Sequence, residues 1–206
     1  MQDRLVEIAE LVLDSIRDAT TAFNAADVAL ADKVIAADPQ IDELAIALDE
    51  LAIEILYRQT PVARDLRIVV SALRMSASLE RMGDLARHIA AIARRRYPDH
   101  VVPEPLRDVF IQMTAHDIRI AELLAELLRS QDVGLAAQLI NGDDAVDRLH
   151  ASVFDTVLAA GWSGDAGQTV DVTLASRFFE RFGDHAASIA KKVQYLATGE
   201  WVPEHL

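Results

Sequence analysis

The sequence contains no cysteine, which excludes disulfide bonds, thiolate metal sites and cysteine nucleophiles. Glycine and proline are scarce, at 8 and 6 of 206 residues, and aromatic residues make up only 5% of the chain. This composition is unlike that of disordered, collagen-like or disulfide-stapled proteins. With 206 residues, 51% of them hydrophobic, the chain is long enough and apolar enough to bury a core.

Long apolar runs are also absent. No stretch of about 18 uncharged apolar residues occurs, so the sequence predicts no membrane-spanning helix. The segment 1–7 carries two acids and no apolar segment follows it, which is not the pattern of a signal peptide. The net charge is −13, which repels phosphate backbones and disfavours a nucleic-acid partner. We therefore expect a cytoplasmic protein.

Apolar residues recur at helical spacing along most of the chain, and no run of strict alternation predicts a strand. The first such face consists of Leu5, Ile8, Val12, Ile16, Ala19 and Phe23. Further helices are predicted over 28–58, from the Thr60-Pro61 turn to 96, over 106–130, over 133–160, and from the 161–167 turn to 198. Pro39 predicts that the second helix either kinks there or restarts with Asp38 as its N-cap.

The plan repeats on either side of a proline-rich linker near residue 100. Residues 80–90 match residues 180–190 at seven of eleven positions, and residues 27–44 match residues 132–149 at eight of eighteen. Internal repeats of this kind define the architecture. We predict an all-α fold of two tandem homologous three-helix bundles, with six helices and an internal pseudo-twofold repeat, divided as residues 1–100 and 101–206.

Each half keeps two pairs of acids spaced four residues apart. They are Asp38/Asp42 and Glu80/Asp84 in the first half, and Asp143/Asp147 and Glu180/Asp184 in the second. Residues four apart share a helix face, where two carboxylates repel each other by a few tenths of a kcal/mol. A bound cation would offset this repulsion, and carboxylate-only sites select hard cations such as Mg²⁺, Mn²⁺ or iron, and Zn²⁺ less so.

The acids also fall at matched levels if the second and third helices of each half are antiparallel. In the first half, the midpoint in residue number between the facing acids is Pro61. In the second half, it falls beside Ser163 and Gly164. Both midpoints lie in predicted turns. We therefore predict one four-carboxylate metal site in each half. Gly83 and Gly183 cost roughly 1 kcal/mol each relative to Ala, and their place between the acids predicts close approach of a neighbour or a ligand shell.

The third helix has two distinct faces. Its predicted core stripe is Ile68, Met75, Leu79, Met82, Ala86 and Ile89. Glu80 and Asp84 lie about 150° or more from the centre of this stripe, so we expect an open, surface-lying metal site. The outer face carries an apolar patch that predicts a dimer or partner interface. This patch consists of Leu66, Val70, Leu73 and Ala77, flanked by Arg64 and Arg67.

Other chemistry finds little support. None of the six histidines follows a Glu by three residues, so the Glu-x-x-His motif of di-iron enzymes is missing. We interpret His88 and His185 as structural, although His88 also lies close enough to Asp84 to join a site. The cations of 94–96 are interpreted as a solvated helix end, and the alternative is a contact for an acidic partner or a membrane surface.

Four segments together carry a specific resemblance: 60–67 (TPVARDLR), 79–84 (LERMGD), 179–186 (FERFGDHA) and 195–200 (YLATGE). In these motifs, and in their order along essentially the whole chain, the sequence resembles the PhoU family of accessory regulators of bacterial phosphate-specific transport. The resemblance implies six helices in two bundles, with multinuclear metal clusters on Glu/Asp-x-x-x-Asp motifs. The sequence departs from the pattern at Pro39, which interrupts the first acidic pair, and at Arg64–Arg67, which has no counterpart in the second half.

The resemblance further implies a non-enzymatic role as a negative regulator of phosphate uptake and of the phosphate-starvation (Pho regulon) response. The implied partners are subunits of the phosphate ABC transporter and a membrane sensor histidine kinase, with a homodimer expected and membrane contact only through partners. Two alternatives remain: a carboxylate-bridged metal store or metalloenzyme, and a purely structural helical scaffold.

Overall fold

The computed structural model describes residues 1–142 and 144–199, and within them every regular element is a helix. The elements are α1 (Gln2–Ala25), α2 (Val28–Gln59), α3 (Arg64–Arg96), the short 3-10 helix η1 (Glu104–Leu106), α4 (Arg107–Ser130), α5 (Val133–Gly142), α6 (Asp144–Val157) and α7 (Ala166–Thr198). None of these helices is both long and apolar enough to cross a membrane. The predicted positions Asp143 and Glu200 lie outside the described residues.

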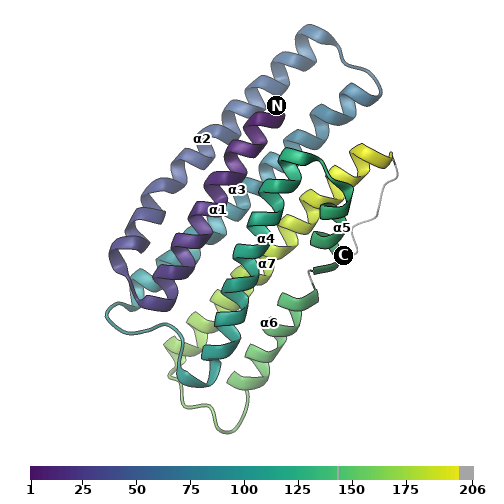
Figure 1. Ribbon diagram of the computed structural model, residues 1–206. Coiled ribbons are helices and arrows are strands. Elements are labelled where there is room, and N and C mark those ends of the chain that lie inside the picture. Colours follow the sequence, from purple (N-terminus) through teal and green to yellow (C-terminus); the bar gives the residue numbers. More distant parts are fainter. Residues whose placement is uncertain (143, 200–206) are drawn as a thin grey trace.

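The helices form two three-helix groups that lie side by side (Figure 1). The first group is α1, α2 and α3; the second is α4, the α5–α6 pair and α7. Between the groups, α1 packs against α4 and α3 packs against α7. The all-α fold of two tandem three-helix bundles is confirmed.

Local signals set the helix boundaries. The Asp27 side chain accepts a hydrogen bond from the Leu30 backbone N–H at 3.0 Å, which caps the start of α2. Asp165 begins α7 with a reciprocal capping box, in which its side chain and that of Gln168 each accept a backbone N–H of the other residue. The predicted helix over 133–160 corresponds to α5 and α6 on either side of residue 143, and it ends earlier, at Val157, because the Gly- and Ser-containing segment 158–165 intervenes before this cap.

Helix α2 continues through Pro39, so the predicted restart at Asp38 does not occur. Pro39 is exposed on the solvent side of α2, where water can replace the missing backbone donor. The apolar residues on either side, Val34 and Ile41, are both buried. Packing of this buried face keeps α2 a single helix despite the cost of the proline.

One continuous core runs through both groups. Where the groups meet, the rings of Phe23, Phe110 and Phe179 pack with centroids 5.5–6.1 Å apart, from α1, α4 and α7. The predicted α3 stripe is buried from Met75 to Ile89, but Ile68 is 39% exposed. Ile68 lines an open groove with Met1 and Leu5 at the start of α1 and Leu196 near the end of α7, so the ends of these helices leave it partly uncovered.

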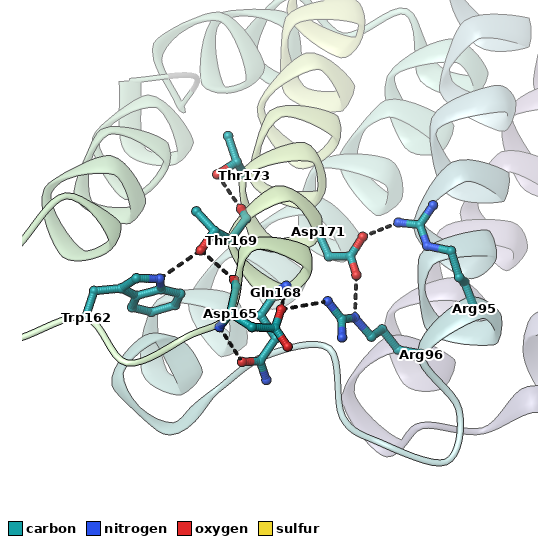
Figure 2. A network of polar contacts seen from close by, with 8 residues as sticks. All are labelled: Arg95, Arg96, Trp162, Asp165, Gln168, Thr169, Asp171 and Thr173. Atoms are coloured by element: carbon teal, nitrogen blue, oxygen red, sulfur yellow. Dashed lines mark hydrogen bonds and ion pairs between the residues drawn. The ribbon is translucent and has the colours of Figure 1, made fainter.

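The end of α3 is tied to the start of α7 by ion pairs (Figure 2). The Asp171 carboxylate, which is almost fully buried, accepts hydrogen bonds from Arg95 and Arg96. Arg94 lies 3.3 Å from a carboxylate oxygen of Asp32. The cations of 94–96 are therefore not merely a solvated helix end, because packing of α3 on α7 brings two of them onto an acid of the other half.

Candidate functional site

Three of the predicted acids meet in the second half. Asp147 on α6 and Glu180 and Asp184 on α7 each offer one carboxylate oxygen, and these oxygens lie within 4.8 Å of one another. Asp147 and Asp184 are exposed, whereas Glu180 is only 9% exposed. The result is an open cluster with one buried member, which we call the second-half cluster.

Glu180 is under electrostatic strain in this cluster. Its Oε1 accepts a hydrogen bond from Arg177 one turn earlier, but its buried Oε2 has no hydrogen-bond partner among the described residues. Burial and the neighbouring Asp184 carboxylate raise the pKa of Glu180 to about 7. Burial, with repulsion from Asp184, also raises the pKa of Asp147. A cation beside Oε2 would relieve both the burial penalty and the repulsion.

The first half arranges its acids around a cation of its own. The Arg87 guanidinium contacts Asp38 on α2 through Nε and Asp84 on α3 through a terminal nitrogen, both at 2.6 Å. Arg81 contacts the other oxygen of Asp84 at 2.8 Å. Arg87 therefore links the two helices whose acids were predicted to hold a metal. We call these residues the first-half cluster, together with Asp42 and Glu80.

The pKa values of the first-half cluster reflect this arrangement. Burial raises the pKa of Asp84, but hydrogen bonds from Arg87 and Arg81 outweigh it and hold that pKa below its ordinary value. The pKa of Asp38 is raised, because burial outweighs its ion pair with Arg87. The pKa of Glu80 is raised by burial, with repulsion from Asp84 and Asp42.

Asp42 and Glu80 do not touch Arg87. They line a surface groove of about 300 Å³ together with Asp49 and Ser76. Asp42 is exposed and Glu80 half-buried, as expected for a surface-lying site. Asp38 differs from that expectation, since it is 8% exposed and lies against α3.

The glycine between the acids of α3 has the predicted role. A Cβ added to Gly83 would lie 2.9 Å from Cδ1 of Ile41 and 3.7 Å from Oδ1 of Asp38. An added Cβ would force the buried Ile41 side chain to shift, so glycine at this position accommodates the packing of Ile41 against α3 at the level of the acids.

Two histidines lie beside the clusters, and one of them contacts a cluster residue: Nε2 of His88 lies 3.3 Å from a terminal nitrogen of Arg87. The His88 ring packs on Phe178 with centroids 5.2 Å apart, and burial lowers its pKa. Nδ1 of His150 lies 2.9 Å from the Ser176 hydroxyl. Within the described ranges, the one group of three or more potential ligands contains carboxylates alone.

Sequence reasoning missed the two arginines that distinguish the clusters. At an offset of 100 residues, Arg87 corresponds to Ala187, and Arg177 corresponds to Ala77. Comparison of the two copies of the repeat could have found these arginines, because they stand at positions where the copies differ.

Comparison with known proteins gives the chain its family. The PhoU domain model matches residues 5–93 and again residues 110–193. A phosphate-specific transport system accessory protein, PhoU homolog 2 of Mycobacterium tuberculosis, is 41% identical over 199 residues, covering 97% of this chain and 93% of the relative. PhoU homolog 1 of Mycobacterium leprae is 39% identical, covering 98% and 90%.

Solved structures agree with this match. The crystal structure of PhoU from Pseudomonas aeruginosa superposes with a TM-score of 0.85 at 26% identity, covering 96% of this chain and 95% of that one. The regulatory protein PhoU from Streptococcus pneumoniae gives a TM-score of 0.86 at 23% identity, covering 98% and 95%, which supports the fold. With the family model matched in both halves and relatives aligned over nearly their whole length, this chain belongs to the PhoU family.

Proposed function

We propose that this protein is a cytoplasmic negative regulator of phosphate uptake and of the phosphate-starvation response. It acts by contact, as an adaptor between the phosphate ABC transporter and a sensor histidine kinase, and it catalyses no reaction. The observation that carries this proposal is the match to PhoU relatives over 97% of the chain, since those relatives are named as accessory proteins of phosphate-specific transport.

We further propose that the acidic clusters hold divalent or trivalent cations. The proposed ligands are Asp38, Asp42, Glu80 and Asp84 in the first half and Asp143, Asp147, Glu180 and Asp184 in the second. The donor set fits hard cations, because carboxylate oxygens suit Mg²⁺, Mn²⁺ or iron better than they suit Zn²⁺. The partnerless Oε2 of Glu180 supports the second-half site. A bound ion would neutralise the clustered charges and tie α6 to α7.

The outer face of α3 is the proposed contact surface, for a partner subunit or for a second copy in a homodimer. Leu66 and Val70 are 41% and 39% exposed on it. The Arg67 guanidinium lies 5.9 Å from the centre of the Tyr195 ring, and Arg64 is exposed nearby. Leu73 is half-buried against the core, whereas Ala77 is exposed, so the accessible part of the patch is Leu66, Val70 and Ala77.

The test is a Val70→Glu, Arg67→Glu double variant in a strain from which the chromosomal copy has been deleted. Both positions are exposed, so the variant should keep its helical circular dichroism while losing repression of starvation genes at high phosphate. Ile111→Glu is the matched control, because Ile111 is 51% exposed on α4 outside this patch. Full repression by the double variant would remove this surface from the proposal.

The open second-half cluster favours one other candidate, a metal store or metalloenzyme. The adaptor role is supported if the double variant fails to complement the deletion strain while its metal content is unchanged. Metal-dependent oxidase or hydrolase activity in the loaded protein supports the alternative.

A further inference from the structure

The Arg87 side chain lies between an acid of α2 and an acid of α3 in the first-half cluster. Its Nε and a terminal nitrogen each contact a carboxylate at 2.6 Å, one on α2 and one on α3. The side chain is 31% exposed, so these contacts are partly shielded from water. Charge-assisted bonds of this length are the stronger class of hydrogen bond. The guanidinium thus performs the bridging between helices that an ion would perform.

The second half has no arginine at the equivalent position to bridge its helices. Ala187 stands at the equivalent position and is buried, so no side chain from there reaches the acids. Arg177 is not a substitute, because its contact is with Glu180 three residues away on the same helix. It leaves the buried Oε2 of Glu180 without a partner and makes no bridge to Asp147 in the described structure.

We propose that Arg87 is a built-in cation that competes with metal ions for the first-half cluster. A divalent ion therefore enters the second half first, and it enters the first half only by displacing the Arg87 guanidinium from Asp38 and Asp84. This inference rests on the proposed metal sites and adds an order of loading and a residue that sets it.

The competition follows from the geometry. An ion held by Asp38 and Asp84 together competes with the Arg87 guanidinium for the same two carboxylates, and the positive charge of Arg87 opposes its binding as long as the two ion pairs persist. In the second-half cluster the ion meets a carboxylate oxygen that is already desolvated and has no partner to lose. Arg81 is a weaker competitor, because its side chain is 61% exposed and it contacts two acids of its own helix, Glu80 at 3.6 Å and Asp84 at 2.8 Å, without reaching Asp38 on α2.

The experiment is a titration of chelator-treated protein with Mn²⁺, in which electron paramagnetic resonance measures free Mn²⁺. Wild-type protein should bind in two phases whose dissociation constants differ by tenfold or more. Glu180→Gln should remove the tight phase, and Glu80→Gln the weak one. Arg87→Met, which keeps the aliphatic length without the charge, should tighten the weak phase at least tenfold. The matched control Arg81→Met should change it by less than threefold.

The outcomes separate the two proposals. Tight binding in the second half with a weak phase unmoved by Arg87→Met overturns the role of Arg87 and leaves the metal site standing. Absence of Mn²⁺ binding by wild type and by Arg87→Met overturns the metal proposal and this inference together. If circular dichroism shows that Arg87→Met does not fold, the order of loading is still tested, because Glu180→Gln and Glu80→Gln assign each binding phase to one half. A tight phase that belongs to the first half contradicts the order of loading.

Discussion

The two halves of this protein repeat the same acidic motifs, but the described acids are neutralised in different ways. In the first half, Arg87 lies between the helices and joins Asp38 to Asp84. In the second, the cluster of Asp147, Glu180 and Asp184 has no such bridge, and one of its oxygens is buried without a partner among the described residues. The repeated motif determines where the carboxylates gather, whereas a single position that differs between the halves, Arg87 against Ala187, determines whether an arginine neutralises them.

The substitution with the largest expected effect tests whether the two halves unfold independently. Phe179→Ala removes a fully buried ring that packs on Phe23 and Phe110 where the two groups meet. We expect a loss of about 3–5 kcal/mol in the free energy of unfolding. Because the ring belongs to a core shared by both groups, calorimetry should show one transition moved to lower temperature.

Phe154→Ala is the control for this change, since Phe154 is 39% exposed and should cost much less. Two separate transitions in Phe179→Ala protein, with only one of them shifted, would mean that the halves unfold on their own.

A smaller effect should separate the halves by their response to metal. Free Mn²⁺ at 100 times the dissociation constant should stabilise the protein by about 2.7 kcal/mol through a single site. Asp184→Ala should abolish most of this gain, whereas Asp84→Ala should leave the tight site intact. Calorimetry with and without chelator measures both.

The metal-free variants sharpen the same contrast. Asp184→Ala removes a repulsion with Glu180 and should change stability by only a few tenths of a kcal/mol. Asp84→Ala takes a partner from both Arg87 and Arg81 and should destabilise by about 1 kcal/mol. Equal loss of metal stabilisation from either substitution would show that the halves share one site.

The last contrast concerns pH. Folding raises the pKa of Glu180 from 4.5 to about 7, so in this window the folded protein holds a proton that the unfolded chain releases. The stability of metal-free protein should therefore fall as pH rises from about 4.5 to about 7. Urea unfolding at several pH values, compared between wild type and Glu180→Gln, isolates this contribution. Parallel pH profiles for the two proteins would contradict the assignment.

Much of the fold is predictable from local sequence. The helix start at residue 28, the Thr60-Pro61 turn and the stripe from Met75 to Ile89 each depend on neighbours in sequence, and each was predicted correctly. The repeat gave the two-bundle plan, because matched segments fold alike. The boundary between the predicted domains 1–100 and 101–206 stays a prediction, since the core is continuous across it.

The features that sequence reasoning missed depend on how distant segments meet. Exposure of Ile68 depends on where the ends of α1 and α7 lie beside the start of α3, and no single helix pattern contains that information. The contacts of Arg95 and Arg96 with Asp171 depend on how one half packs on the other. The reach of Arg87 to Asp38 depends on the relative register of two helices, and a long flexible side chain has several partners within range.

The contacts of α1 with α4 and of α3 with α7 are contacts between equivalent helices, which is the geometry of a symmetric dimer joined into one polypeptide. In a true homodimer every substitution appears in both subunits, so the two sites must stay identical. Within one polypeptide that constraint is absent, and each copy of the motif can carry its own residue. Arg87 and Ala187 are such a difference, an asymmetry that separate identical subunits cannot encode.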